Sequence, residues 1–209
     1  MNSRLTGLIA FLIIIVAVWL NFNFDQPQYE ADDNISLTKF STARAFVHVE
    51  AIAKEPHYLG SPTHNQVRNY IVDELQELGL EVQTQEGYNL NKRGALARPQ
   101  NIIARIEGSG DGYALVLMTH YDSAMHSSYG ASDAGSGVAT ILEGIRAFLE
   151  SKASHKNDII LLFTDGEELG LHGAQLFVKI TSRLSLLIFL LTILVLSNGI
   201  LSFLSGCNS

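Results

Sequence analysis

The feature that most constrains this chain is the placement of its apolar residues, which gather in two runs near the ends. Leu5–Leu20 (LTGLIAFLIIIVAVWL) contains no charged residue and directly follows Arg4. A helix that crosses a bilayer needs roughly 20 apolar residues, so this run has the length of a short membrane anchor or of a signal-peptide core. The second run, Leu184–Leu204, is long enough to span a bilayer as well. We therefore expect a globular domain only between the two runs.

Residues 1–24 are predicted to form an uncleaved signal anchor, and a cleaved signal peptide is the alternative. Trp19 and Asn21–Phe24 occupy the positions where a cleavage site needs small residues. Aromatic residues at the end of an apolar run are typical of a membrane–water interface. Arg4 precedes the run and several acidic residues follow it, which predicts a cytoplasmic N-terminus and an exported domain, either periplasmic, extracellular or lumenal.

Composition excludes several classes of function for the domain between the two apolar runs. The whole chain has 21 Asp and Glu against 14 Lys and Arg, a formal net charge of −7. A nucleic-acid-binding protein needs a basic face, so we expect no nucleic-acid partner. The single Cys excludes a disulfide framework within the chain and a zinc finger built on cysteines.

Apolar periodicity between the runs predicts alternating helices and buried strands. Such alternation favours the α/β class, with a mixed, largely parallel central sheet flanked by helices. The expected boundaries are an anchor over 1–24, a linker over 25–35, a folded domain over 36–180 and an apolar tail over 181–209. The expected helices cover 36–53, 65–78, 138–149 and 170–178, and the expected strands cover 80–85, 100–107, 113–119 and 158–163.

Three polar clusters follow buried strands or open helices, where open α/β sheets place their ligands. The first is HYDS, in which His120 is followed two residues later by Asp122. The second is GASDAGSG, a run of small residues around Asp133. The third is TDGEELG, in which Glu167 and Glu168 come directly after a buried strand. Neighbouring acids in such a place are costly unless a cation or a proton compensates them.

Each cluster taken alone has a simpler interpretation. His120 and Asp122 could be an incidental surface pair, Asp133 a helix N-cap, and Glu167 and Glu168 part of a solvated loop. Together, in this order and each at a strand end, they predict a metal site. In such a site Asp122 would accept the second ring N–H of His120 and so fix its tautomer.

The motifs resemble those of the zinc aminopeptidase family (peptidase family M28), over about residues 48–178. PHYLGSP at Pro56, NIIARIEG at Asn101 and the three clusters carry the resemblance. HYDS and the apolar N-terminus are most similar to the endoplasmic-reticulum and vacuolar branch and its bacterial relatives. The resemblance implies a mixed α/β hydrolase fold and a membrane-bound enzyme that removes residues from peptides with a free N-terminus.

The resemblance also implies the site and its cofactor, two zinc ions. His120 would bind one zinc, Asp133 would bridge both, and Glu168 would bind the second. Glu167 would be the general base that activates a shared water, and Asp122 would orient His120. The resemblance therefore implies two catalytic residues, Glu167 and Asp122. The motifs assign no residue to any other cofactor, and they leave the side-chain preference and the oligomeric state open.

The resemblance stops after Val178. The family supplies a further acidic ligand and a further His ligand from later sequence, whereas no Asp, Glu or His follows Lys179 here. His155 and His172 lie upstream, and we interpret them as a loop residue and a helix-face residue. Two explanations are open: a frameshift or truncation near Lys179, which we favour, or a genuine short protein that ends in a membrane helix. Both predict weak zinc binding and little hydrolysis.

Two other functions are compatible with these motifs. One is a non-catalytic, membrane-anchored binding module with a protease-like fold, although such a module would have no need of Glu167. The other is a glutaminyl cyclase, which shares the fold and a similar His-x-Asp-Ser stretch.

Overall fold

The computed structural model describes residues 3–24, 34–110, 113–126 and 128–183, and the chain divides into two units, Met1–Ala31 and Asp32–Ser209. The first unit contains helix α1 (Ser3–Phe24), and its stretch Arg4–Phe24 is long and apolar enough to cross a membrane. The apolar side chains of α1 are exposed in the structure. The predicted apolar tail lies outside the described residues, except for its first three positions at the end of helix α5 (His172–Arg183).

The second unit is built on a four-stranded sheet with the order β1-β4-β6-β5. Strand β6 pairs in parallel with β5, whereas the pairs β4–β6 and β1–β4 are antiparallel. The α/β class is therefore confirmed, but only one of these three pairings is parallel. The strands are β1 (Val82–Glu86), β4 (Gln100–Ile106), β5 (Ala114–His120) and β6 (Asp158–Thr164).

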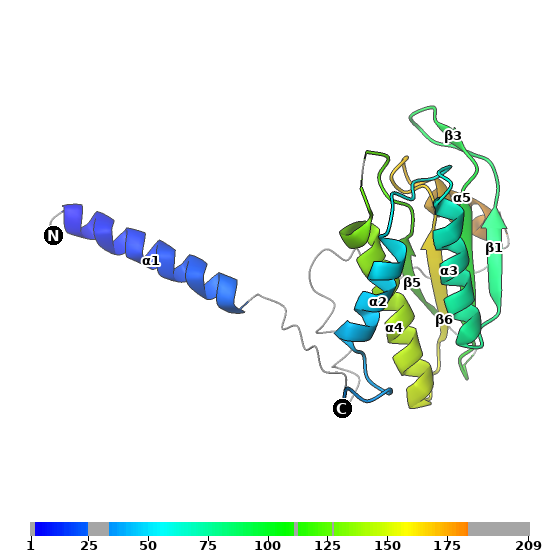
Figure 1. The fold of residues 1–209 in the computed structure, drawn as a ribbon, viewed down its shortest axis with the longest axis horizontal. Helices are drawn as coiled ribbons and strands as arrows, with labels where there is room; N and C mark the ends of the chain where they lie inside the picture. The colour runs from blue at the N-terminus through cyan, green and yellow to red at the C-terminus, as the bar shows by residue number, and fades with distance from the viewer. Residues whose placement is uncertain (1–2, 25–33, 111–112, 127, 184–209) are drawn as a thin grey trace. The chain divides into compact units, whose positions relative to one another are not determined.

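Helices cover both faces of this sheet, which explains why its inner strands are apolar without alternation. Helices α2 (Thr42–Ile52), α3 (His64–Glu77) and α4 (Ser136–Ser151) lie on one face, and α5 lies on the other (Figure 1). Strand β6 supplies both cores: Leu161 and Phe163 pack in the cluster with α3 and α4, whereas Leu162 packs with Phe177 of α5. The first and third polar clusters are thus attached to strands β5 and β6, which pack against helices.

The expected helices and strands are all present, with ends displaced by a few residues. The pattern did not reveal a small hairpin of two strands, β2 (Asn89–Leu90) and β3 (Leu96–Ala97). Each of these strands has only two residues, which is too short to produce an alternating pattern. The hairpin follows β1 and precedes β4 along the chain.

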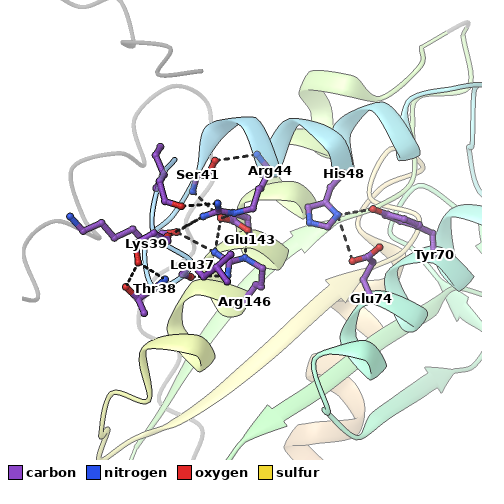
Figure 2. A network of polar contacts seen from close by, with 12 residues as sticks. Leu37, Thr38, Lys39, Ser41, Arg44, His48, Tyr70, Glu74, Glu143 and Arg146 are labelled. Carbon is purple, nitrogen blue, oxygen red and sulfur yellow. Dashed lines mark hydrogen bonds and ion pairs between the residues drawn. The ribbon is translucent and has the colours of Figure 1, made fainter. Parts of the chain in front are cut away.

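A buried carboxylate joins the start of the second unit to α4. The Glu143 side chain is fully buried and accepts hydrogen bonds from Arg44 (3.0 Å), from Arg146 (2.6 and 2.9 Å) and from the Ser41 backbone N–H (2.9 Å), as Figure 2 shows. The two guanidinium groups in turn donate to backbone carbonyls in the segment 35–39. We call this group the Glu143 clamp, consisting of Ser41, Arg44, Glu143 and Arg146.

Two glycines of α4 give a matched test of helix packing against the sheet. A methyl group at Gly137 would overlap Thr119 Oγ1 of β5 and lie 3.2 Å from Thr119 Cβ, whereas one at Gly144 would meet nothing within 4 Å. We expect Gly137→Ala to lower the free energy of unfolding by about 1–3 kcal/mol through overpacking. Gly144→Ala should raise it by about 0.5–1 kcal/mol, because alanine favours the helix.

Urea unfolding of the full chain in detergent micelles, followed by circular dichroism, measures both effects. Equal effects of the two substitutions would contradict the close packing of α4 on β5.

Candidate metal centre

The first and third clusters lie side by side at the carboxyl ends of a parallel strand pair. His120 is the last residue of β5 and is the register partner of Thr164, the last residue of β6. The pairing continues one step further, because the Tyr121 N–H donates to the Thr164 carbonyl at 3.1 Å. Two motifs that are more than forty positions apart in sequence therefore leave the sheet at the same place.

His120 lies between two oxygen acceptors. Its Nδ1 donates to the backbone carbonyl of Asp122 at 3.0 Å and lies 3.4 Å from Asp122 Oδ1. Its Nε2 lies 2.9 Å from Asp133 Oδ1. Burial alone would lower the pKa of His120, but the hydrogen bonds and negative charges of Asp122 and Asp133 outweigh burial and raise this pKa to about 9.

Asp122 does more than the sequence predicted. Its carboxylate is fully buried and accepts the backbone N–H groups of Glu167 (3.0 Å) and Glu168 (3.2 Å). The nearest partner of His120 Nδ1 is the Asp122 backbone carbonyl at 3.0 Å rather than the expected carboxylate, whose Oδ1 lies 3.4 Å away. A single residue thus contacts His120 and fixes the backbone of both acids. In the sequence, the only sign of the contact with the backbone N–H groups of Glu167 and Glu168 is the position of Asp122 beside a strand end.

Asp133 reaches His120 from the turn that opens α4. It lies in the turn η1 (Ala131–Gly135), where its own backbone is extended rather than helical (φ −119°, ψ 99°), and its side chain is 79% exposed. Gly130 precedes this turn with φ +63°, and a Cβ at Gly130 would lie 2.9 Å from His57 Cε1 and 3.0 Å from Ser123 Cβ. A glycine is required there for both reasons. The alternative interpretation of Asp133 as a helix cap finds no support, because α4 begins at Ser136 and its N-cap is Gly135, with no side-chain cap hydrogen bond.

Glu167 and Glu168 are partly buried and follow β6 through Gly166. Burial and then the negative charge of Asp133 raise the pKa of Glu168 above its usual range. The structure thus joins His120, Asp122 and Asp133 by direct contacts, and it ties Glu167 and Glu168 to them through their backbone.

The residues present suit zinc in their chemistry. Imidazole and carboxylate are zinc ligands, and the Nδ1 contact leaves Nε2 of His120 facing Asp133. The 2.9 Å contact between His120 Nε2 and Asp133 Oδ1 places two such ligand atoms side by side, where they would hold the ion. Within residues 3–24, 34–110, 113–126 and 128–183, however, no three His, Cys, Asp or Glu side chains already converge as a metal cluster.

Several buried polar residues beside the site were not found by sequence reasoning. His172, expected on a helix face, is fully buried at the start of α5, where its ring contacts Asn89 and Asn91 at 3.2 Å each. His64 and Asp165 form a buried pair at 2.7 Å. His155 does lie in a loop, between α4 and β6. Partners so distant in sequence leave no periodic signal.

Comparison with known families matches residues 101–195 to the profile of Peptidase family M28. Over this segment the chain is similar to peptidase family M28. The match begins at β4 and includes all three clusters of the site. The resemblance to this family that the motifs indicated is therefore confirmed.

Relatives of this chain include proteins named vacuolar membrane protease. The one from Candida albicans is 31% identical over 182 residues, covering 84% of this chain and 21% of the relative. The one from Schizosaccharomyces japonicus is 30% identical over 193 residues, covering 85% and 22%. The chain thus spans about a fifth of the length of the curated relatives that it matches.

Solved structures with the same fold include two enzymes with different activities. The glutaminyl cyclase of Porphyromonas gingivalis is 29% identical with a TM-score of 0.54, covering 60% of this chain and 45% of the other. A Zn-dependent exopeptidase from Parabacteroides distasonis is 24% identical with a TM-score of 0.59, covering 69% and 57%. The second likeness supports the M28 fold alone.

Proposed function

We propose that this chain carries the catalytic part of a membrane-anchored, zinc-dependent aminopeptidase that hydrolyses peptides with a free N-terminus. The observation that carries the proposal is the contact set of Asp122 and Asp133 around His120. Through Asp122 the same set reaches the backbone of Glu167 and Glu168. These are the residue types that zinc hydrolysis needs, and they meet at one edge of one sheet.

In this proposal His120 and Asp133 would hold the first zinc, and Asp133 and Glu168 would hold the second. Zinc, when bound, supplies a Lewis acid that polarises the scissile carbonyl and lowers the pKa of water towards about 7. Glu167 accepts the proton of the attacking water and returns it to the amine of the leaving product. Asp122 keeps the His120 ring and the Glu167 backbone in place. The further acidic ligand and His ligand that the family resemblance implies after Val178 have no counterpart in this sequence, because no Asp, Glu or His follows Lys179.

The proposed setting follows from α1 and from the names of the relatives. Helix α1 would anchor the domain in a membrane, with the catalytic domain on the exported side and the Arg4 end in the cytoplasm. A peptide with a free N-terminus is the proposed substrate.

A second candidate is glutaminyl cyclisation, which the 29% identity to the Porphyromonas gingivalis glutaminyl cyclase favours. Cyclisation releases ammonia from an N-terminal Gln, whereas hydrolysis releases the first amino acid. The two products distinguish the activities directly.

The test uses the full chain in detergent micelles, first stripped of metal and then supplied with zinc. We expect weak zinc binding, and slow release of the first residue from a peptide only after zinc is added. His120→Ala should remove both properties, whereas His155→Ala, a loop substitution outside the site, should remove neither. Pyroglutamate from a Gln-terminal peptide with no hydrolysis would support the cyclase instead. Neither product and no bound zinc would contradict both candidates.

A further inference from the structure

His64 and Asp165 form a buried pair that the proposed chemistry does not use, and Asp165 lies two residues before Glu167 in the sequence. His64 is the first residue of α3 and is 3% exposed, and Asp165 is 0% exposed. Their Nε2 and Oδ1 atoms are 2.7 Å apart. Because a carboxylate only accepts, the His64 N–H donates to Asp165. A buried carboxylate without such donors is costly, so Asp165 depends on this contact.

The other polar atoms of Asp165 bind to two further elements. Its Oδ2 accepts the Gln100 N–H at 2.8 Å, and its own N–H donates to Asn101 Oδ1 at 3.2 Å, both on β4. Its carbonyl accepts the Gly173 N–H of α5 at 2.7 Å. Asp165 therefore connects α3, β4 and α5 at the point where β6 ends.

The His64 ring also contacts the other motif. It stacks on Tyr121 with ring centroids 5.1 Å apart and an interplanar angle of 24°. Tyr121 stands between His120 and Asp122 in sequence, and its hydroxyl donates to the Gln100 carbonyl at 2.8 Å. One imidazole thus touches the strand-end segments that carry the proposed ligands from β5 and from β6.

The backbone turns immediately after Asp165. Gly166 has φ +66°, in the left-handed region, so the chain changes direction between Asp165 and Glu167. Asp122 holds the far side of this turn through the N–H groups of Glu167 and Glu168. We propose that His64 is a positioning residue: by holding Asp165, it fixes the direction in which Glu167 and Glu168 enter the site. Its consequence for catalysis rests on the proposed function.

The test distinguishes the effect of the hydrogen bond from His64 to Asp165 from the effect of the ring stacking of His64 on Tyr121. His64→Phe keeps an aromatic ring against Tyr121 but removes the donor, and His64→Gln keeps an N–H donor but removes the ring. Hydrogen–deuterium exchange of the full chain in micelles reports the order of residues 165–170 without any metal. We expect His64→Phe to speed exchange there about tenfold or more, and His64→Gln to speed it less. Asp165→Asn, which keeps the shape of the side chain, should reproduce the effect of His64→Phe.

A control comes from the same domain. His48 of α2 is partly buried, with its Nδ1 2.6 Å from the Tyr70 hydroxyl and 3.9 Å from Glu74 Oε2, and within the described part of the chain both of these partners lie on α3 rather than in the strand-end motifs. His48→Phe should leave exchange in residues 165–170 unchanged. Unchanged exchange in both His64→Phe and Asp165→Asn would overturn the proposal, as would an equal effect of His48→Phe.

Zinc affinity and turnover give the functional readout. We expect His64→Phe to lower kcat by about tenfold or more with little change in KM, because the acids lose their placement while the surface that binds the peptide is untouched. It should also weaken zinc binding, with partial rescue in His64→Gln. Should the unmodified chain show no zinc-dependent turnover, the proposed function fails, whereas the exchange experiment still decides the role of His64.

Discussion

Replacing Glu167 by Gln is expected to lower zinc-dependent kcat by about 10²- to 10⁴-fold, the usual contribution of a general base. The amide keeps the size of the side chain but cannot accept a proton from water. The backbone N–H of residue 167 can still donate to Asp122, as it does at 3.0 Å, so the turn should keep its shape. The measurement is steady-state release of an N-terminal residue by the full chain at saturating zinc.

The neighbouring acid provides the matched control. Glu168→Gln should mainly weaken zinc binding, because Glu168 is the proposed ligand, whereas Glu167→Gln should retain the zinc affinity of the unmodified chain. Zinc titration of both variants separates the two roles even where turnover is slow. The assignment of base and ligand would be wrong if Glu167→Gln lost zinc and Glu168→Gln kept both zinc and turnover.

The second large effect is expected on stability. Glu143→Ala should lower the free energy of unfolding by about 3 kcal/mol, the usual cost of removing one partner of a buried ion pair. Arg44 and Arg146 lose their common acceptor, and the Ser41 N–H loses the oxygen that it contacts at 2.9 Å. Urea unfolding followed by circular dichroism measures the difference.

Glu150→Ala is the control, since Glu150 lies on the same helix but is exposed, and its removal should change stability by less than about 0.5 kcal/mol. The clamp would be unimportant if both substitutions had the same small effect.

The contribution of Glu143 should also depend on pH. Burial by itself would raise the pKa of Glu143, but hydrogen bonds from Arg146, Ser41 and Arg44 lower this pKa below its usual value. A carboxyl whose pKa is lower in the folded state stabilises that state above its unfolded pKa of about 4.3 and loses this effect as pH falls. The difference between the unmodified chain and Glu143→Ala should therefore be constant near neutrality and shrink below about pH 4.

Long apolar patterns made much of the fold predictable. Helix α3 buries Val67, Ile71 and Leu75 on one face, and this spacing is visible in the sequence. The apolar runs of β5 and β6 identified buried strands and placed two motifs at one sheet edge. The direction of β4 was not encoded in its composition, because a strand buried on both faces is apolar in either orientation. The sheet is therefore less parallel than the pattern suggested.

The site was predictable as a set of residue types but not as a set of contacts. The meeting of His120 with Asp133 follows from their positions at neighbouring turns. The double acceptance by Asp122 depends on the exact course of the turn after β6, which no residue pattern specifies. The same holds for His64 and Asp165, which lie 101 positions apart and meet only because α3 packs across the sheet end.

The binding of segment 35–39 by Arg44 and Arg146 has a mechanical consequence. Tension applied through the chain from the N-terminal side reaches these carbonyls before it reaches α2 or any strand. Several hydrogen bonds, gathered on two guanidinium groups, must then break together rather than one after another. Stretching should accordingly act first on the hydrogen bonds of the Glu143 clamp. The strand ends that carry His120 and Glu167 should keep their structure until those hydrogen bonds break.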